Sequence, residues 1–279
     1  MMKKIASQDI IKKVSLALAN INTHIDPTIE RFLKNKLSML DDRERKIVDI
    51  LMKNSEIAGA ESIPLCQDTG SVVVFATIGN EVQLEDDLQS IINRSVRESY
   101  ERCFFRKSIT RDPLKRENTK DNTPAIIHIE SVKGDICRFE IAAKGGGSEN
   151  ISALRMLKPA DGEQGIIDFV LTQIADNGKN ACPPLIIGIG IGGNFETCAK
   201  LSKKALFRDI GSRHREEYYS FLEQRILNEV NMLGIGAGGY GGLLTAMDVF
   251  IETAPCHIAS LPVAINVGCH SNRHTVVEM

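Results

Sequence analysis

Aromatic residues are scarce in this sequence, and tryptophan is absent. Phenylalanine and tyrosine make up only 5% of the 279 residues, so a surface that stacks nucleic-acid bases on aromatic rings is not expected. A strong net charge is missing as well, because 34 basic residues stand against 36 acidic ones and both kinds are mixed along the chain. Nucleic acid is therefore excluded from the expected partners.

Long apolar runs are also missing. Runs such as "SVVVFATIG" at 71–79 and "PPLIIGIGIGG" at 183–193 are far shorter than the roughly 20 residues that cross a bilayer. No apolar stretch follows the lysines of the N-terminal "MMKKIASQDI", as a secretory signal would require. We therefore expect a cytoplasmic protein without a membrane partner.

Closely paired cysteines are a third absence, since no CxxC motif occurs. The seven cysteines are an odd number and are scattered along the chain, at positions 66, 103, 137, 182, 198, 256 and 269. This distribution favours thiols or metal ligands in a reducing compartment over a disulfide framework. Three of them lie inside helix or strand patterns and are expected in the core: Cys103, Cys137 and Cys198.

The apolar periodicity that is present predicts a helical N-terminal part. A first helix is expected after a cap at Ser7, and a second opens at Asp26-Pro27. A third follows Asp41 and Glu44, which are spaced like a capping box, and a fourth is marked by an apolar stripe that starts at Leu84.

Strand patterns then alternate with helices. Two β-rich runs around Lys133-Gly134-Asp135 predict a hairpin, and "PPLIIGIG" predicts a buried strand. Further helices are expected near 164–176, over "NFETCAKLSKKALF" and near 215–232, with a β-rich stretch from Leu243 to Val267. Because no repeat or linker interrupts the chain, we expect one mixed α/β (α+β) domain over residues 1–279, with glycine-rich loops between mixed-sheet segments.

Two glycine-rich segments could bind ligands. Gly188, Gly190 and Gly193 satisfy the GxGxxG pattern of an NAD-dependent dehydrogenase, but Asp209, the nearest acid at the required distance, lies in no strand pattern. The alternative is that these glycines let the backbone pass close to a ligand or another element. In "KGGGSEN", backbone N–H groups at a strand end suit a carboxylate or phosphate, unless the glycines form a plain turn.

The turn "PLCQDTG" joins a thiol, an amide, a carboxylate and a hydroxyl on consecutive positions. Two interpretations are open: a buried cysteine next to an aspartate, Asp68, that forms a turn, or a site with a chemical role. Together with "NTKDNTPA", "KGGGSEN", "ACPPLIIGIGIGG" and "IETAPCHIASLPVAINVGCHSNRH", in this order, it resembles the N-terminal domain of class I fumarate hydratases. The resemblance covers nearly the whole chain and is strongest to the separate alpha subunit of the two-subunit enzymes.

This resemblance implies a [4Fe–4S] cluster held by three cysteines. Matched motif by motif, the ligands are Cys66, Cys182 and Cys269. Thiolates are the usual cluster ligands, and three of them leave one iron open as a Lewis acid. The implied reaction is the reversible hydration of fumarate to L-malate.

The same resemblance implies the residues that handle the substrate. Asp68 and His257 are the implied catalytic groups, for acid–base chemistry and for proton relay or orientation. The dicarboxylate would be bound by side chains or backbone N–H groups of four further residues: Gln67, Arg106, Gly146 and Gly147. The sequence departs from the family at Lys120, where glycine is usual, which puts the backbone shape of that loop in doubt.

A second departure is that the chain lacks the C-terminal domain of full-length class I enzymes. We therefore expect a beta subunit that carries this domain, in an α2β2 hetero-oligomer. The L(+)-tartrate dehydratase alpha subunit is the alternative, although it typically lacks the lysine of "KGGG" and the "ETAPCH" stretch. A cluster-carrying subunit without catalytic activity is a third possibility.

Overall fold

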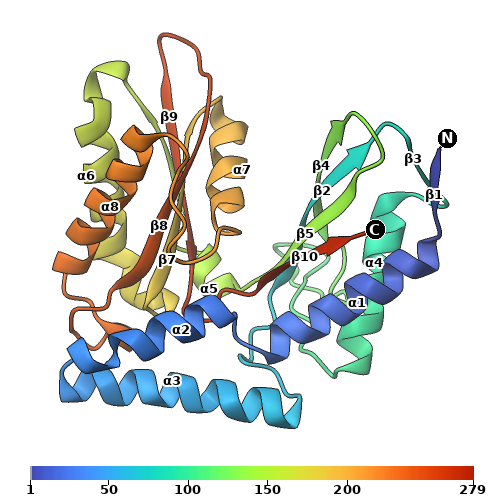
Figure 1. Ribbon diagram of the computed structural model, residues 1–279, viewed down its shortest axis with the longest axis horizontal. Helices are drawn as coiled ribbons and strands as arrows, with labels where there is room; N and C mark the ends of the chain where they lie inside the picture. Colours follow the sequence, from blue (N-terminus) through green and yellow to red (C-terminus); the bar gives the residue numbers. More distant parts are fainter. Residues whose placement is uncertain (1) are drawn as a thin grey trace. The chain divides into compact units, whose positions relative to one another are not determined.

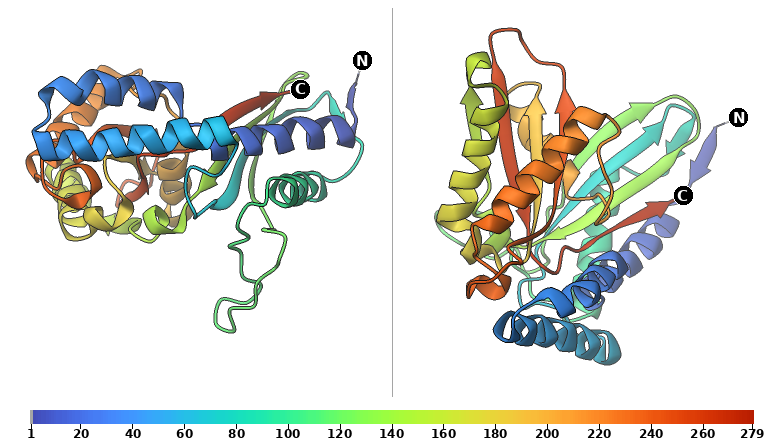
Figure 2. Two further views of the ribbon diagram at one scale, coloured as in Figure 1. Left: turned by 90° about the horizontal axis from the view of Figure 1, so that it is seen from below. Right: turned by 60° about the vertical axis from the view of Figure 1, so that its left-hand side comes forward.

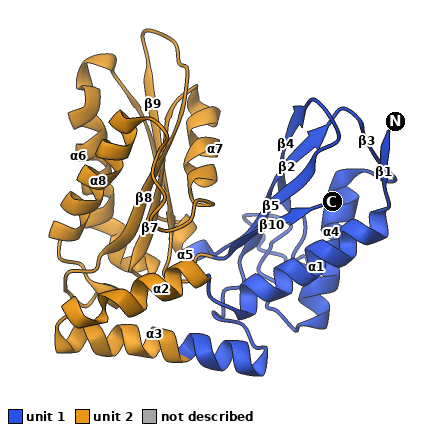
Figure 3. Ribbon diagram, in the orientation of Figure 1, with its two compact units in different colours: residues 1–26, 54–146, 273–279 blue, residues 27–53, 147–272 orange. Residues whose placement is uncertain are grey.

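The computed structural model describes residues 2–279, and its contacts cluster into two compact units (Figures 1 and 3). Unit 1 contains residues 1–26, 54–146 and 273–279, and unit 2 contains residues 27–53 and 147–272. Helices combine with sheets of parallel and antiparallel strands in each unit, which confirms the mixed α/β class. Among the helices of residues 2–279, none has both the length and the apolar character needed to cross a membrane.

Unit 1 is built on a four-stranded sheet of order β10-β5-β2-β4. Its strands are β2 (Ser71–Gly79), β4 (Ile126–Val132), β5 (Cys137–Lys144) and β10 (His274–Glu278). A separate parallel pair joins β1 (Lys3–Ile5) to β3 (Val82–Leu84). The helices of this unit are α1 (Ser7–Thr23), α4 (Leu88–Arg102) and the C-terminal part of α3 (Asp42–Glu61).

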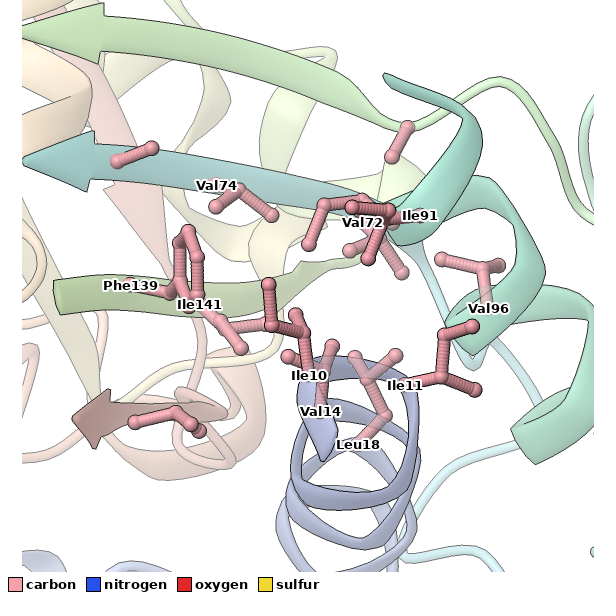
Figure 4. Packing of buried hydrophobic residues seen from close by; sticks show 14 of the residues in the cluster. Ile10, Ile11, Val14, Leu18, Val72, Val74, Ile91, Val96, Phe139 and Ile141 are labelled. Carbon is pink, nitrogen blue, oxygen red and sulfur yellow. The ribbon is translucent and has the colours of Figure 1, made fainter. Parts of the chain in front are cut away.

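The core of unit 1 lies between one face of this sheet and helices α1 and α4 (Figure 4). The apolar stripe of α1 contributes Ile10, Val14 and Leu18, all fully buried. They pack with alternate residues of β2, including Val72 and Val74, because successive side chains of a strand point to opposite faces. The helical periodicity read from the sequence therefore locates this core correctly.

The predicted hairpin of β4 and β5 is wrong. Strand β2 lies between them and pairs with β4 in parallel and with β5 in antiparallel orientation. The turn at Gly134 instead crosses the end of β2, where the N–H of Gly79 donates to the carbonyl of Ile136 over 2.7 Å. Because β2 is buried along most of its length, it takes the central position and leaves exposed β4 at the edge.

Two helices begin at other residues than the sequence predicted. Ser7 is the first residue of α1, not its cap, and its N–H donates to Glu85 Oε2 over 2.9 Å. Leu84 ends β3, and α4 begins at Leu88, capped by the Asp87 carboxylate, which accepts the N–H of Ser90.

Unit 2 is a second four-stranded sheet, of order β6-β9-β7-β8, with helices on both faces (Figure 1). The strands are β6 (Ala153–Leu157), β7 (Leu185–Gly192), β8 (Ala246–Ala254) and β9 (Leu261–Gly268). Helices α6 (Gly162–Asn177) and α8 (Glu217–Met232) cover one face, and α7 (Phe195–Ala205) covers the other. The remaining elements are α2 (Pro27–Lys36), α5 (Gly146–Glu149) and four short 3₁₀ turns: η1 (Leu37–Met39), η2 (Pro159–Asp161), η3 (Gly178–Ala181) and η4 (Ala237–Gly239).

Strand β7 alternates isoleucine and glycine for a packing reason. Ile187, Ile189 and Ile191 join the core with α6 and α8. Gly188 and Gly190 face α7, where an added Cβ would lie 2.2 Å from the carbonyl oxygen of Ser202 and 2.0 Å from that of Cys198. The glycines therefore allow α7 to lie directly on the strand, as the alternative to a dinucleotide fingerprint predicted.

Candidate active site and metal centre

In unit 1 the "CQDTG" turn fixes the side chain of Asp68 between backbone donors. The N–H of Gly70 donates to Asp68 Oδ1 over 3.0 Å, and the N–H of Gly146 donates to Oδ2 over 2.6 Å. The N–H of Asp68 itself lies 3.4 Å from the sulfur of Cys66. The Asx-turn interpretation of Asp68 is thus correct for one oxygen. The other oxygen is held by Gly146 of the run Gly145-Gly146-Gly147, here called the glycine segment.

The glycine segment is shaped around this carboxylate. A Cβ on Gly145 would lie 3.2 Å from Asp68 Oδ2 and 3.4 Å from an Arg273 nitrogen, so a side chain at this position would crowd both groups. The N–H of Gly146, predicted to face the substrate, faces Asp68 in this structure. Gly147 begins the part of the segment that belongs to unit 2.

Arg106 is joined to the same turn through its backbone. Thr69 Oγ1 donates to the carbonyl of Arg106 over 2.7 Å, while the side chains of Arg106 and Gln67 are exposed. Hydrogen bonds of this turn therefore involve four of the predicted site residues: Cys66, Asp68, Arg106 and Gly146. Gln67 lies between Cys66 and Asp68 in the chain.

Two buried residues that the sequence did not single out support this turn. The hydroxyl of Tyr100 donates to the carbonyl of Thr69 over 2.6 Å and lies 3.2 Å from that of Gly70. Asn122 Nδ2 also donates to the Gly70 carbonyl, over 3.0 Å. Tyr100 continues the apolar stripe of α4, so its periodicity gave no signal that set it apart from a core residue.

We expect the protein to lose stability at high pH because the Tyr100 hydroxyl is buried. Desolvation raises the pKa of Tyr100 to about 12 from an ordinary 10.0. Between these values the unfolded chain has lost the proton and the folded chain keeps it, so the free energy of unfolding should fall by about 3 kcal/mol. Tyr100→Phe should start about 1 kcal/mol less stable and lack this decline, which urea unfolding from pH 9 to 12 would measure. Equal declines in both proteins would contradict the assignment.

The loop from α4 to β4 extends away from the rest of unit 1 (Figure 2). The two arms of this loop are joined by a single antiparallel bridge between Thr110 and Asn118. Lys120 follows with a φ of 68°, and its N–H donates to Asn118 Oδ1 over 2.7 Å. Lys120, which the resemblance marks as a departure from glycine, thus has the left-handed backbone conformation that favours glycine.

Lys120→Gly should consequently stabilise the protein. Removing the Cβ from a left-handed residue relieves roughly 1–2 kcal/mol, of which the greater freedom of glycine in the unfolded chain takes back part. We expect a net gain of about 0.5–1 kcal/mol in urea unfolding. Lys120→Ala, which removes the charge but keeps the Cβ, is the matched control, and an equal gain in that variant would refute the backbone explanation.

In unit 2 the chain brings Cys182 next to the residue that follows Cys269. The N–H of His270 donates to the carbonyl of Cys182 over 3.4 Å, and His270 Nδ1 lies 3.1 Å from the same oxygen. Cys269 is half-buried, with its sulfur 3.3 Å from Ser271 Oγ. Cys182 is exposed and has a φ of 54°, a backbone conformation that costs a non-glycine residue free energy and often marks a functional position.

His257 lies at the other end of the same sheet. Gly268, just before Cys269, pairs with Ile186 near the start of β7, whereas Ala254, just before the His257 loop, pairs with Gly192 at its end. These ends are about 20 Å apart at roughly 3.3 Å per residue. Within this chain, the structure does not bring His257 to Cys182 and Cys269.

Two of the remaining four cysteines are unsuited to bind a metal because they are buried in the core. Burial raises the pKa of the Cys137 and Cys198 thiols, which opposes thiolate formation, and both lie in the core as predicted. Cys103 packs partly buried against the core of unit 1. Cys256 is exposed in the His257 loop.

Each of the three cysteines, taken by itself, has the thiol chemistry that a ligand of an iron–sulfur cluster needs. No disulfide occurs within residues 2–279, and Cys66, Cys182 and Cys269 all lie outside the core, at turns or strand ends. In contrast, the GxGxxG segment does not offer an open phosphate site, because α7 occupies the space beside Gly188 and Gly190, and the N–H of Gly193 donates to the carbonyl of Pro255.

Comparison with known proteins agrees with these features. The model of the family described as "Fumarate hydratase (Fumerase)" matches residues 11–278. A protein of Methanocaldococcus jannaschii named "Putative L(+)-tartrate dehydratase subunit alpha" is 46% identical over 233 residues, which cover 81% of each chain. The L(+)-tartrate dehydratase subunit alpha of Escherichia coli strain UTI89 is 32% identical over 287 residues, covering 100% of this chain and 95% of its own.

Proposed function

We propose that this chain, which belongs to the fumarate hydratase (Fumerase) family, is the alpha subunit of an iron–sulfur hydro-lyase that acts on a four-carbon dicarboxylate. Fumarate and L-malate are the preferred pair in this proposal. The observation that carries it is the Asp68 carboxylate, fixed at both oxygens beside Cys66 by the N–H groups of Gly70 and Gly146.

Cys66, Cys182 and Cys269 would hold a [4Fe–4S] cluster in this proposal. Three protein thiolates leave one iron without a protein ligand, and the bound cluster then supplies a Lewis acid for substrate oxygens. The left-handed backbone of Cys182 supports this role, because a residue under backbone strain is retained where its side chain has a task.

Asp68 would transfer the proton of the water that is added or lost. Its two backbone hydrogen bonds fix the direction of the carboxylate, as a general acid–base group requires. Arg106, with an exposed guanidinium beside this turn, would bind a substrate carboxylate through two parallel N–H donors. Gln67 and the N–H groups of Gly146 and Gly147 would complete the recognition of the dicarboxylate, with Gly146 also orienting Asp68.

His257 would act at a site to which another chain contributes. It lies at the end of the unit 2 sheet opposite to Cys182 and Cys269, so its predicted relay role requires a neighbouring molecule. The relatives are named as alpha subunits, which supports a beta subunit as partner. We extend the proposal to an α2β2 assembly in the cytoplasm.

Dehydration of L(+)-tartrate is the second candidate. The names of the relatives in Methanocaldococcus jannaschii and Escherichia coli favour it. Both reactions remove water from a four-carbon dicarboxylate and use the same groups of this chain, so the substrate must be assigned by assay.

The experiment is anaerobic co-expression with a candidate beta subunit and assay under argon with fumarate, mesaconate and both tartrate enantiomers. We expect hydration of fumarate by the complex and little activity of this chain alone. Turnover of L(+)-tartrate but not fumarate would establish the second candidate. A colourless chain that binds NAD would refute both and favour a dehydrogenase, whereas a brown complex that turns over none of the substrates would indicate a cluster-carrying subunit.

A further inference from the structure

Glu44 is a fully buried residue in unit 2 whose carboxylate is not used in the predicted capping box. The Asp41 side chain accepts the N–H of Glu44 over 2.8 Å, which is half of the predicted capping box. The other half is absent, because Glu44 Oε1 accepts the N–H groups of Ala237 and Leu244 over 3.1 and 2.8 Å, and Oε2 accepts that of Leu243 over 3.0 Å. Its side chain therefore serves a segment almost 200 residues away.

This segment, "GIGAGGYGG" at 234–242, is here called the glycine loop. It closes tightly over Glu44, since a Cβ on Gly242 would lie 2.5 Å from the Glu44 carboxylate. The 0% exposure of Glu44 means that water cannot replace the carboxylate as acceptor for these N–H groups. Each buried N–H left without a partner costs about 1–3 kcal/mol, so the conformation of the glycine loop depends on Glu44.

The glycine loop in turn holds the residues that follow Cys182. The N–H of Gly238 donates to the carbonyl of Pro183 over 2.8 Å, and the N–H of Leu185 donates to the carbonyl of Thr245 over 2.8 Å. Pro183 and Pro184 have no N–H of their own. The segment that carries Cys182 is therefore fixed from its C-terminal side by the glycine loop and by Thr245.

Thr245 hydrogen-bonds both to the glycine loop and to Leu185 in the segment after Cys182. Its hydroxyl accepts the N–H groups of Ile235 and Gly236 over 3.1 and 3.3 Å. Asn231 Oδ1 accepts the N–H of Thr245 over 2.9 Å. The chain of contacts thus runs from Glu44 through the glycine loop to Pro183, the neighbour of Cys182.

We infer that Glu44 is a positioning residue for Cys182, which it holds in a left-handed, ligand-ready conformation through the glycine loop. The inference rests on the proposed function, because it assigns to Glu44 the task of keeping one cluster ligand in place. Residues that do not bind the metal but hold its ligands in place commonly raise metal affinity by roughly 10- to 100-fold.

The test measures iron retention by the full-length chain. Wild type, Glu44→Gln and two controls are reconstituted anaerobically with ferrous iron and sulfide, and the release of iron to a chelator is followed. Asp42→Asn, at an exposed position of the same helix turn, controls for charge. Val230→Ala, in the core of unit 2, controls for a general loss of stability.

We expect Glu44→Gln to release iron about tenfold faster than wild type, and both controls to release it at the wild-type rate. Hydrogen exchange should show faster exchange at the amides of Gly238 and Leu185 in Glu44→Gln only. If Glu44→Gln does not fold, Thr245→Val and Thr245→Ser carry the test, since serine keeps the hydroxyl acceptor and should restore retention.

Two failures are distinguishable. Equal iron release from Glu44→Gln and Val230→Ala would overturn the positioning role and leave the proposed function intact. No iron uptake by the wild-type chain, even in the presence of the beta subunit, would refute the cluster and with it both proposals.

Discussion

Replacing Cys182 with serine should abolish the cluster and the hydro-lyase activity together. A serine hydroxyl is a poor cluster ligand in comparison with a thiolate. Loss of a residue that hydrogen-bonds to a metal ligand lowers metal affinity about 10- to 100-fold. Loss of the ligand itself should lower the affinity further. Iron and sulfide analysis of the anaerobically purified complex, together with its rate of fumarate hydration, gives the result directly.

Two further variants separate ligation from backbone effects. Cys182→Gly should also lose the cluster but gain roughly 0.5–1 kcal/mol in unfolding free energy without iron, because glycine adopts the left-handed conformation freely. Cys256→Ser changes an exposed cysteine in the same unit and should leave the iron content unchanged. A brown, active Cys182→Ser complex would show that Cys182 is not a ligand.

Asp68→Asn should reduce the turnover number by about 10²- to 10⁴-fold, the usual contribution of a general acid–base group. The amide keeps nearly the same shape and one oxygen acceptor for Gly70 or Gly146, but it cannot exchange the proton of the substrate water. Iron content should stay at the wild-type level, since Asp68 is not a ligand in this account. Steady-state kinetics under argon measure the effect.

The control for this prediction is Asp135→Asn, an exposed carboxylate on the connection between β4 and β5. It should leave both kcat and KM unchanged. If Asp68→Asn raised KM alone and kept kcat, its role would be substrate binding, and the proposed proton transfer would be wrong.

The sequence located the elements well where the signal was local. The stripes of α1, α6 and α8 recur every three to four residues, and the alternation in β7 reports a strand buried on both faces. The predicted hairpin of β4 with β5 was wrong because strand order depends on β2, which lies between them in the sheet and more than 40 residues earlier in the chain. Sequence neighbours usually pair, and only the burial of β2 decides otherwise.

The candidate site was suggested only by the resemblance and stays a prediction. Cys182 and Cys269 lie 87 residues apart, a spacing with no metal signature, and Cys182 lies beside His270, the neighbour of Cys269, because β9 returns antiparallel along β7. Glu44 shows the opposite case, since its spacing from Asp41 matched a local capping box while its carboxylate serves a distant loop. Tyr100 and Asn122 were hidden because a buried polar group looks like any other core or turn residue until its partners are known.

Iron and acid-labile sulfide counted per chain in the anaerobic complex, for wild type and for single serine variants of each cysteine, test the central claim most directly. The account predicts a [4Fe–4S] cluster in wild type, its loss in the variants of Cys66, Cys182 and Cys269, and full retention in the variant of Cys256. Iron retained in any of the first three variants, or an iron-free wild type with full hydratase activity, would contradict it.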